Sequence, residues 1–268
     1  MLGSHRAGRI ALARCIGLYN GIGDFSATCA GAKPVTRYTA AVTTADSQSV
    51  AIEVDDTTRV SGLLMVPQGS TVCFVVAHGA GAGMLHPFMV NLANDLAALR
   101  IATLRYQFPY MERRGRRPDA PAVCQATVRA AVAAAGARLP SLPLIAGGKS
   151  FGGRMTSQAQ AARPLPRVRG LVFLGFPLHP PKEPSDKRGE HLFLVHVPML
   201  FVQGARDAFA ELPLLNPLLK RLGGGSTLCL LPDADHSFEV PARSAVGGRQ
   251  TWEEMLHALA AWTVTVTA

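Results

Sequence analysis

The sequence is poor in acidic residues and aromatic residues, and it contains no long apolar run. Its 18 Asp and Glu stand against 27 Lys and Arg, and aromatic side chains make up 6% of the chain. A membrane-spanning helix needs about 20 consecutive apolar residues. No stretch approaches that length, so we expect no membrane partner. The five cysteines form no CxxC pair and no metal-ligand spacing, which favours buried thiols in a reducing, cytoplasmic compartment.

Apolar residues nevertheless make up 48% of the 268 residues and charged residues 17%, a composition typical of a globular domain with a large core. The net charge of +9 raises the question of a nucleic-acid partner. Part of the charge belongs to the N-terminal segment, and another part belongs to one loop that contains Arg113, Arg114, Arg116 and Arg117. We interpret that loop as solvated, with an anionic substrate or partner as the alternative, and we expect no nucleic acid.

Residues 1–40 show neither helical nor strand periodicity and are rich in Gly, Ala and Arg. Arg14 interrupts the apolar stretch Ile10–Leu18, which argues against a secretory signal. A presequence, a wrongly chosen start codon and a disordered tail remain open. We expect a loosely ordered extension over 1–40, followed by a single domain over 41–268.

Strand and helix patterns alternate through that domain. Short apolar or alternating runs predict strands at Ser49–Val54, Arg59–Val66, Val72–Ala77, Ile101–Tyr106, Leu142–Ala146, Leu171–Phe176, Met199–Gln203 and Thr227–Leu231. Helices are predicted at Pro87–Leu99, Ala120–Arg138, Phe151–Ala162, Leu212–Leu222 and Thr251–Trp262, and a Pro-rich loop at Pro177–Val197. After an opening hairpin, this alternation predicts an α/β fold with a mostly parallel sheet and helices on both faces.

The segment Gly148-Lys149-Ser150-Phe151-Gly152 matches the G-x-S-x-G nucleophile elbow. Such an elbow is a sharp turn from strand to helix, where glycines leave room beside a strained serine. Glycine is frequent in this chain, so the pattern is informative only because a predicted strand precedes it and a predicted helix follows. The same residues also resemble the end of a P-loop, but that motif requires glycine where Pro143 stands.

A second glycine-rich segment, His78-Gly79-Ala80-Gly81, follows the third predicted strand. A dinucleotide fingerprint here would require glycine in place of Met84. In hydrolases with a nucleophile elbow, the loop after the third strand donates one backbone N–H to the oxyanion, and the residue after the nucleophile donates another. We therefore predict that the amides of Ala80 and Phe151 form an oxyanion hole, and that His78 is a structural hydrogen-bonding residue.

Asp207 and His236 each follow a predicted strand, and the order Ser, Asp, His is that of hydrolases with a nucleophile elbow. A histidine exchanges protons near neutral pH, and a carboxylate fixes its tautomer. We therefore predict Ser150 as nucleophile, His236 as base and Asp207 as the acid that orients it. The remaining candidates, His179, His191 and His196, have no zinc-ligand spacing and are interpreted as loop anchors.

Taken together, these motifs resemble the α/β-hydrolase superfamily, and within it a small dienelactone-hydrolase-like group of predicted bacterial hydrolases. That group is related to the hydrolase-like domains of the testis-expressed and non-specific-lethal chromatin-complex proteins. The matching stretches are 78–84, 102–112, 147–154, 175–181, 203–207 and 235–236. Phe151 stands where the group often has Met, and Ala208 where it often has Pro; dienelactone hydrolases themselves usually carry Cys at the position of Ser150. The resemblance implies the α/β-hydrolase fold and the triad.

We expect a serine hydrolase that cleaves an ester, thioester or related acyl bond of a small molecule, without a metal or organic cofactor. The connection Pro177–Val197 is too short for a large lid, so the cleft should be open. Tyr106 and Tyr110 follow the fourth predicted strand and are candidates to line the substrate pocket. The alternative is a non-catalytic binding or scaffold protein on the same fold. That reading would be favoured by a broken triad, which this sequence does not have.

Overall fold

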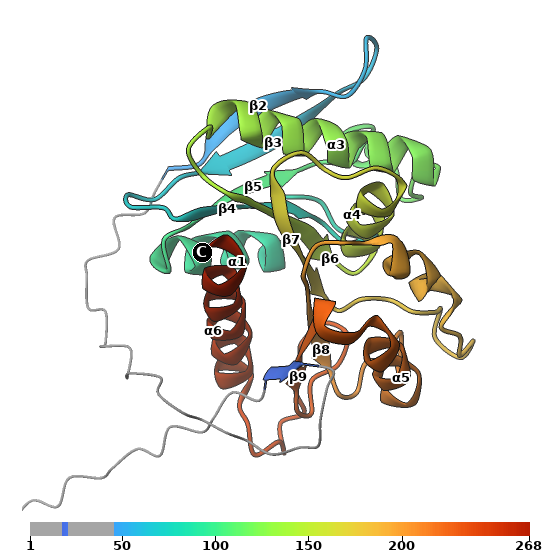
Figure 1. Ribbon diagram of the computed structural model, residues 1–268. Coiled ribbons are helices and arrows are strands. Elements are labelled where there is room, and N and C mark those ends of the chain that lie inside the picture. Colours follow the sequence, from blue (N-terminus) through green and yellow to red (C-terminus); the bar gives the residue numbers. More distant parts are fainter. Residues whose placement is uncertain (1–17, 21–45) are drawn as a thin grey trace, which may run out of the picture.

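The computed structural model describes residues 18–20 and 46–268 (Figure 1). Over these residues, nine strands form one sheet in the order β1-β9-β8-β7-β6-β4-β5-β3-β2. The strands are β1 (Leu18–Asn20), β2 (Gln48–Glu53), β3 (Arg59–Met65), β4 (Val72–Ala77), β5 (Ile101–Tyr106), β6 (Leu144–Lys149), β7 (Val168–Leu174), β8 (Met199–Gly204) and β9 (Ser226–Leu231). The helices are α1 (Pro87–Ala98), α2 (Pro109–Glu112), α3 (Pro121–Arg138), α4 (Phe151–Ala162), η1 (Lys187–Leu194), α5 (Leu212–Leu222), η2 (Gly223–Gly225) and α6 (Gly248–Thr267).

The sheet has the predicted architecture. The strands from β4 to β9 run parallel to their neighbours, and the β2–β3 hairpin joins them antiparallel through β5. The sequence did not predict β1, which pairs antiparallel with β9 at the opposite edge. A three-residue strand is too short to show alternation, which explains why it was missed. The rest of the predicted extension over 1–40 lies outside the described residues.

Helices cover both faces of the sheet (Figure 1). One buried apolar cluster joins the sheet to α3, α4, α5 and η1, and a second joins it to α1 and α6. The predicted helices all form, and α6 extends beyond the predicted Thr251–Trp262 at both ends. Two short helical segments, α2 and η1, occupy stretches that the sequence assigned to connections. Within the residues that the structure describes, no helix is both long and apolar enough to cross a membrane.

Strand β6 differs from its prediction in a way that positions the site. The sequence predicted Leu142–Ala146, but the strand continues to Lys149 because its glycine residues pair with β4 on one side and with β7 on the other. A Cβ atom on Gly148 would overlap the carbonyl oxygen of Ala77 on β4. Only glycine therefore allows the neighbouring strands to approach so closely, and Ser150 follows the last strand residue directly.

Candidate active site

Ser150 occupies the single residue between β6 and α4. Its backbone has φ +50° and ψ −115°, a conformation that costs a non-glycine residue free energy and that persists only where neighbours enforce it. Two of those neighbours are visible. The Ser150 N–H donates to the carbonyl of Leu174 on β7 at 3.0 Å, and a Cβ atom on Gly152 would lie 2.6 Å from the carbonyl oxygen of His78. The turn thus leaves the Ser150 side chain partly exposed at the carboxyl edge of the sheet.

The structure brings Ser150, His236 and Asp207 into one line of hydrogen bonds. His236 Nε2 lies 2.8 Å from Ser150 Oγ, and His236 Nδ1 lies 2.7 Å from Asp207 Oδ2. A carboxylate only accepts, so Nδ1 carries the proton and Nε2 accepts from the serine hydroxyl. The Asp207 side chain is fully buried and the His236 side chain is 20% exposed. The arrangement can therefore move a proton from the serine to the histidine.

Two further residues hold the carboxylate and the imidazole. Gln203, at the end of β8, donates from Nε2 to Asp207 Oδ2 at 2.5 Å and accepts at Oε1 from the Phe176 N–H at 2.9 Å. The Phe209 N–H donates to Asp207 Oδ1 at 2.8 Å, and the Phe209 ring lies 4.2 Å from the imidazole of His236, centroid to centroid. Both oxygens of Asp207 are thus hydrogen-bonded, which restricts the direction in which it accepts from His236.

Phe151 directly follows Ser150, and Ala80 lies in the loop after β4; that their amides form an oxyanion hole stays a prediction. Phe151 is the first residue of α4, where backbone N–H groups have no intrahelical acceptor. The Ala80 carbonyl accepts from the Tyr110 hydroxyl at 2.7 Å, which fixes the loop that carries the Ala80 amide. His78 is fully buried, its Nδ1 donates to the Gly79 carbonyl at 2.8 Å and its Nε2 accepts from the Phe108 N–H at 3.1 Å. Burial lowers the pKa of His78 to about 4, so it is a neutral structural residue at neutral pH.

The prediction that Tyr106 and Tyr110 line a substrate pocket is wrong for this structure. Each side chain is only 1% exposed, and both belong to the apolar core under α3. Strand β5 is buried on both faces, so Tyr106 packs inside the sheet, and Tyr110 is occupied by its bond to Ala80. Burial raises the pKa of both phenols, as expected for groups removed from water.

A second serine–histidine contact lies nearby. Ser157 Oγ on α4 is 2.7 Å from His191 Nε2 on η1, but Ser157 is fully buried and also donates to the Arg154 carbonyl. Burial lowers the pKa of His191 to about 4, with the charge of Arg154 contributing. No carboxylate is hydrogen-bonded to His191 within the described chain, so this pair lacks the third member that Ser150 and His236 have. Among those same residues, no group of three His, Cys, Asp or Glu could hold a metal ion.

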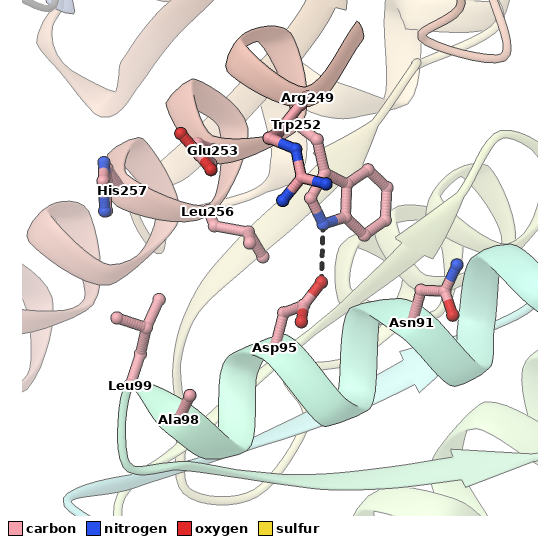
Figure 2. Close-up of a pocket in the computed structure, with 9 residues that line it drawn as sticks. All are labelled: Asn91, Asp95, Ala98, Leu99, Arg249, Trp252, Glu253, Leu256 and His257. Carbon is pink, nitrogen blue, oxygen red and sulfur yellow. Dashed lines mark hydrogen bonds between the residues drawn. The ribbon is translucent and has the colours of Figure 1, made fainter. Parts of the chain in front are cut away.

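A surface groove of about 470 Å³ lies between α1 and α6, away from these residues (Figure 2). It is lined by side chains of both signs of charge, and the Trp252 indole N–H donates to Asp95 Oδ2 across it at 2.7 Å. None of the nine lining residues is Ser150, Asp207 or His236. The nine residues that line the groove include no serine or cysteine.

The structure has a mostly parallel sheet covered by helices, a serine at a strand-to-helix turn, and a buried carboxylate and a histidine at successive strand ends. These features define the class of α/β-fold hydrolases. Residues 70–264 match the family described as alpha/beta hydrolase domain, and the chain belongs to that family.

Solved structures agree on the fold. A dienelactone hydrolase from Anabaena variabilis superposes with a TM-score of 0.64 at 21% identity, covering 82% of this chain and 98% of that one. An alpha-beta serine hydrolase homologue from Coxiella burnetii gives 0.63 at 16% identity, with 80% and 96% covered. A serine hydrolase without lid from Xanthomonas campestris gives 0.63 at 20% identity, with 81% and 95% covered. The chain is thus similar in fold to dienelactone-hydrolase-like enzymes.

Sequence reasoning missed three residues of the site: Lys149, Gln203 and Phe209. Lys149 lies beside Ser150 and donates from Nζ to the His236 main-chain carbonyl at 2.5 Å. Gln203 lies four residues before Asp207, near the end of β8. The sequence could therefore have placed it at the carboxyl edge of the sheet, beside the other site residues. Phe209 has no comparable signal, because its role depends on the path of the loop after Asp207.

Proposed function

We propose that this chain is a serine hydrolase that cleaves an ester, thioester or related acyl bond of a small molecule, with Ser150, His236 and Asp207 as its catalytic triad. The observation that carries the proposal is the continuous pair of hydrogen bonds, 2.8 Å from Ser150 to His236 and 2.7 Å from His236 to Asp207. A hydrogen bond of this length to a histidine activates a serine hydroxyl that is otherwise a weak nucleophile.

In the proposed reaction, Ser150 Oγ attacks the acyl carbon and its proton passes to Nε2 of His236. Asp207 stabilises the imidazolium through the bond at Nδ1. The amides of Phe151 and Ala80 donate to the oxyanion of the tetrahedral intermediate, and each such donor contributes about 2.7–4 kcal/mol in enzymes of this kind. The bond to the alcohol or thiol breaks, and the leaving group takes the proton from His236. A water molecule then attacks the acyl-enzyme through the same steps, which releases the acid and restores Ser150.

The test is covalent labelling with a fluorophosphonate probe, which reacts with an activated serine. We expect stoichiometric labelling of the full chain and its loss in Ser150→Ala. Ser157→Ala is the matched control, because Ser157 also contacts a histidine but is buried, and we expect it to label as the unmodified chain does. A panel of p-nitrophenyl esters, thioesters and lactones with short acyl groups then identifies the preferred bond.

The opposite outcome is equally informative. Folded protein that neither labels at Ser150 nor turns over any member of the panel would overturn the proposal. It would favour the alternative of a binding or scaffold protein that keeps the hydrolase fold.

A further inference from the structure

Lys149 is a partly buried cation that the proposed reaction does not use. It ends β6 and immediately precedes Ser150, and its side chain reaches the loop after β9. There its Nζ donates to the main-chain carbonyl of His236 at 2.5 Å. A lysine placed between two residues of a proposed triad, and bonded to one of them, needs a physical explanation.

The surroundings of the Lys149 amine favour a cation. The ring of Phe238 lies 5.0 Å from Nζ and the ring of Phe88 from α1 lies 5.9 Å away, both within the range of cation–π attraction. The charged groups that act on it are the carboxylates of Asp207 and Asp235. Burial lowers the pKa of Lys149 to about 8, and the two carboxylates oppose that change. At neutral pH the side chain therefore carries its charge for the most part.

The amine also lies close to the imidazole itself. A Cβ atom built on Gly175, at the end of β7, would be 3.0 Å from Lys149 Nζ and 3.4 Å from His236 Nδ1. The two nitrogens are therefore both in contact range of one small gap that glycine leaves open.

We propose that Lys149 is a positioning residue of the triad, which holds the His236 backbone through its carbonyl. The inference rests on the proposed function of Ser150 and His236. It assigns one effect to this side chain: the hydrogen bond to the main chain of His236 sets the reach of Nε2 towards Ser150.

The experiment measures the rate constant of fluorophosphonate labelling of the full chain near neutral pH. Lys149→Met keeps an unbranched apolar stem against the two phenylalanine rings but removes the hydrogen-bond donor and the charge. We expect labelling to slow by about 10-fold, the equivalent of one hydrogen bond to a charged group.

Chemical rescue separates this effect from a general loss of structure. Lys149→Cys should behave as Lys149→Met, and alkylation with 2-bromoethylamine restores an amine at the length of lysine and should recover the labelling rate. The unmodified chain treated with the same reagent is the control, because the sequence has five other cysteines. Cys73, Cys124 and Cys229 are buried, and Cys15 and Cys29 lie outside the described residues. Lys149→Gln replaces the methionine variant if the latter does not fold.

The outcomes distinguish this inference from the proposed function. If the unmodified chain is not labelled at Ser150, the proposed function fails, and the inference fails with it. If the unmodified chain is labelled, and folded Lys149→Met or Lys149→Gln reacts with the same rate constant, only the role of Lys149 is overturned. A slower Lys149→Cys variant whose rate aminoethylation does not recover also overturns it, because that result describes a structural effect alone.

Discussion

Gln203 on β8 forms hydrogen bonds with Asp207 of the proposed triad and with the Phe176 N–H, which follows β7. Its replacement by methionine tests how much these hydrogen bonds contribute to stability and to the reactivity of Ser150. The side chain is fully buried. Its amide donates to Asp207 Oδ2 at 2.5 Å, and its Oε1 accepts from the buried Phe176 N–H at 2.9 Å. Methionine has a similar length and flexibility, so Gln203→Met removes both hydrogen bonds and little volume.

The expected cost has two parts. Leaving the Phe176 N–H buried without an acceptor costs about 1–3 kcal/mol, and losing a hydrogen bond to a charged group costs about 1.5–3 kcal/mol. Together they predict a loss of about 2.5–6 kcal/mol in the free energy of unfolding, a large share of the 5–15 kcal/mol typical of a domain. In a domain of this size that corresponds to a fall in Tm of roughly 5–24 °C. Labelling at Ser150 should slow as well, because Asp207 then keeps only Phe209 to hold it besides His236.

Gln160 provides the matched control. It is also a buried glutamine, and its Oε1 accepts from the Leu165 N–H at 2.8 Å, but it contacts neither Asp207 nor His236. Gln160→Met should therefore cost only the orphaned N–H, about 1–3 kcal/mol, and leave the labelling rate unchanged. Urea unfolding and fluorophosphonate labelling of both variants give the comparison. Equal losses of stability in the two variants, together with unchanged labelling in Gln203→Met, would refute the reasoning.

Two other predictions follow from the same geometry. Gly175 and Gly223 both have positive φ, +73° and +66°, but a Cβ would contact Lys149 and His236 only at Gly175, whereas nothing lies within 4 Å at Gly223. Alanine at either position should lower the free energy of unfolding, measured in urea, by about 1–2 kcal/mol because of backbone strain. Only Gly175→Ala should also slow labelling of Ser150. Equal labelling rates in the two variants would contradict this prediction. Burial lowers the pKa of His78 and of His191 to about 4, so the unfolded chain binds these protons from about pH 6.5 downward before the folded chain does. The free energy of unfolding should therefore fall as the pH drops from 6.5 towards about 4, by at most about 3 kcal/mol for each histidine. Chemical unfolding at a series of pH values should show a smaller fall for His191→Gln. An unchanged dependence of stability on pH in that variant would show that His191 is not buried as a neutral group.

The carboxyl edge of the sheet could be predicted because local patterns determine it. Apolar runs such as Val72–Ala77 are readable as strands buried on both faces, and helices such as Phe151–Ala162 are readable from their periodicity. Parallel strands all end at the same edge, so residues that follow them meet there whatever the details of packing. Ser150, Asp207 and His236 were predicted by this rule, and their hydrogen bonds agree with it.

The contacts that adjust the site could not be predicted in the same way. Whether Tyr106 faces a pocket or the core depends on what covers both faces of β5, and the structure covers both. The reach of Lys149 to the His236 carbonyl depends on an open gap at Gly175 between residues 87 positions apart in the chain. Such contacts have no sequence period, because they arise where separate elements pack together.

The sequence by itself therefore determined the order of strands and helices, the elbow around Ser150 and the strand ends that carry Asp207 and His236. These follow from periodicity and from the steric demand for glycine, which act over a few residues. Only the tertiary structure decided that Gln203 and Phe209 form hydrogen bonds with Asp207. The same is true of the hydrogen bond from Lys149 to the His236 carbonyl, and of the bond from the buried Tyr110 hydroxyl to the Ala80 carbonyl. Those decisions depend on the direction and burial of single side chains, which the packing of the whole domain sets.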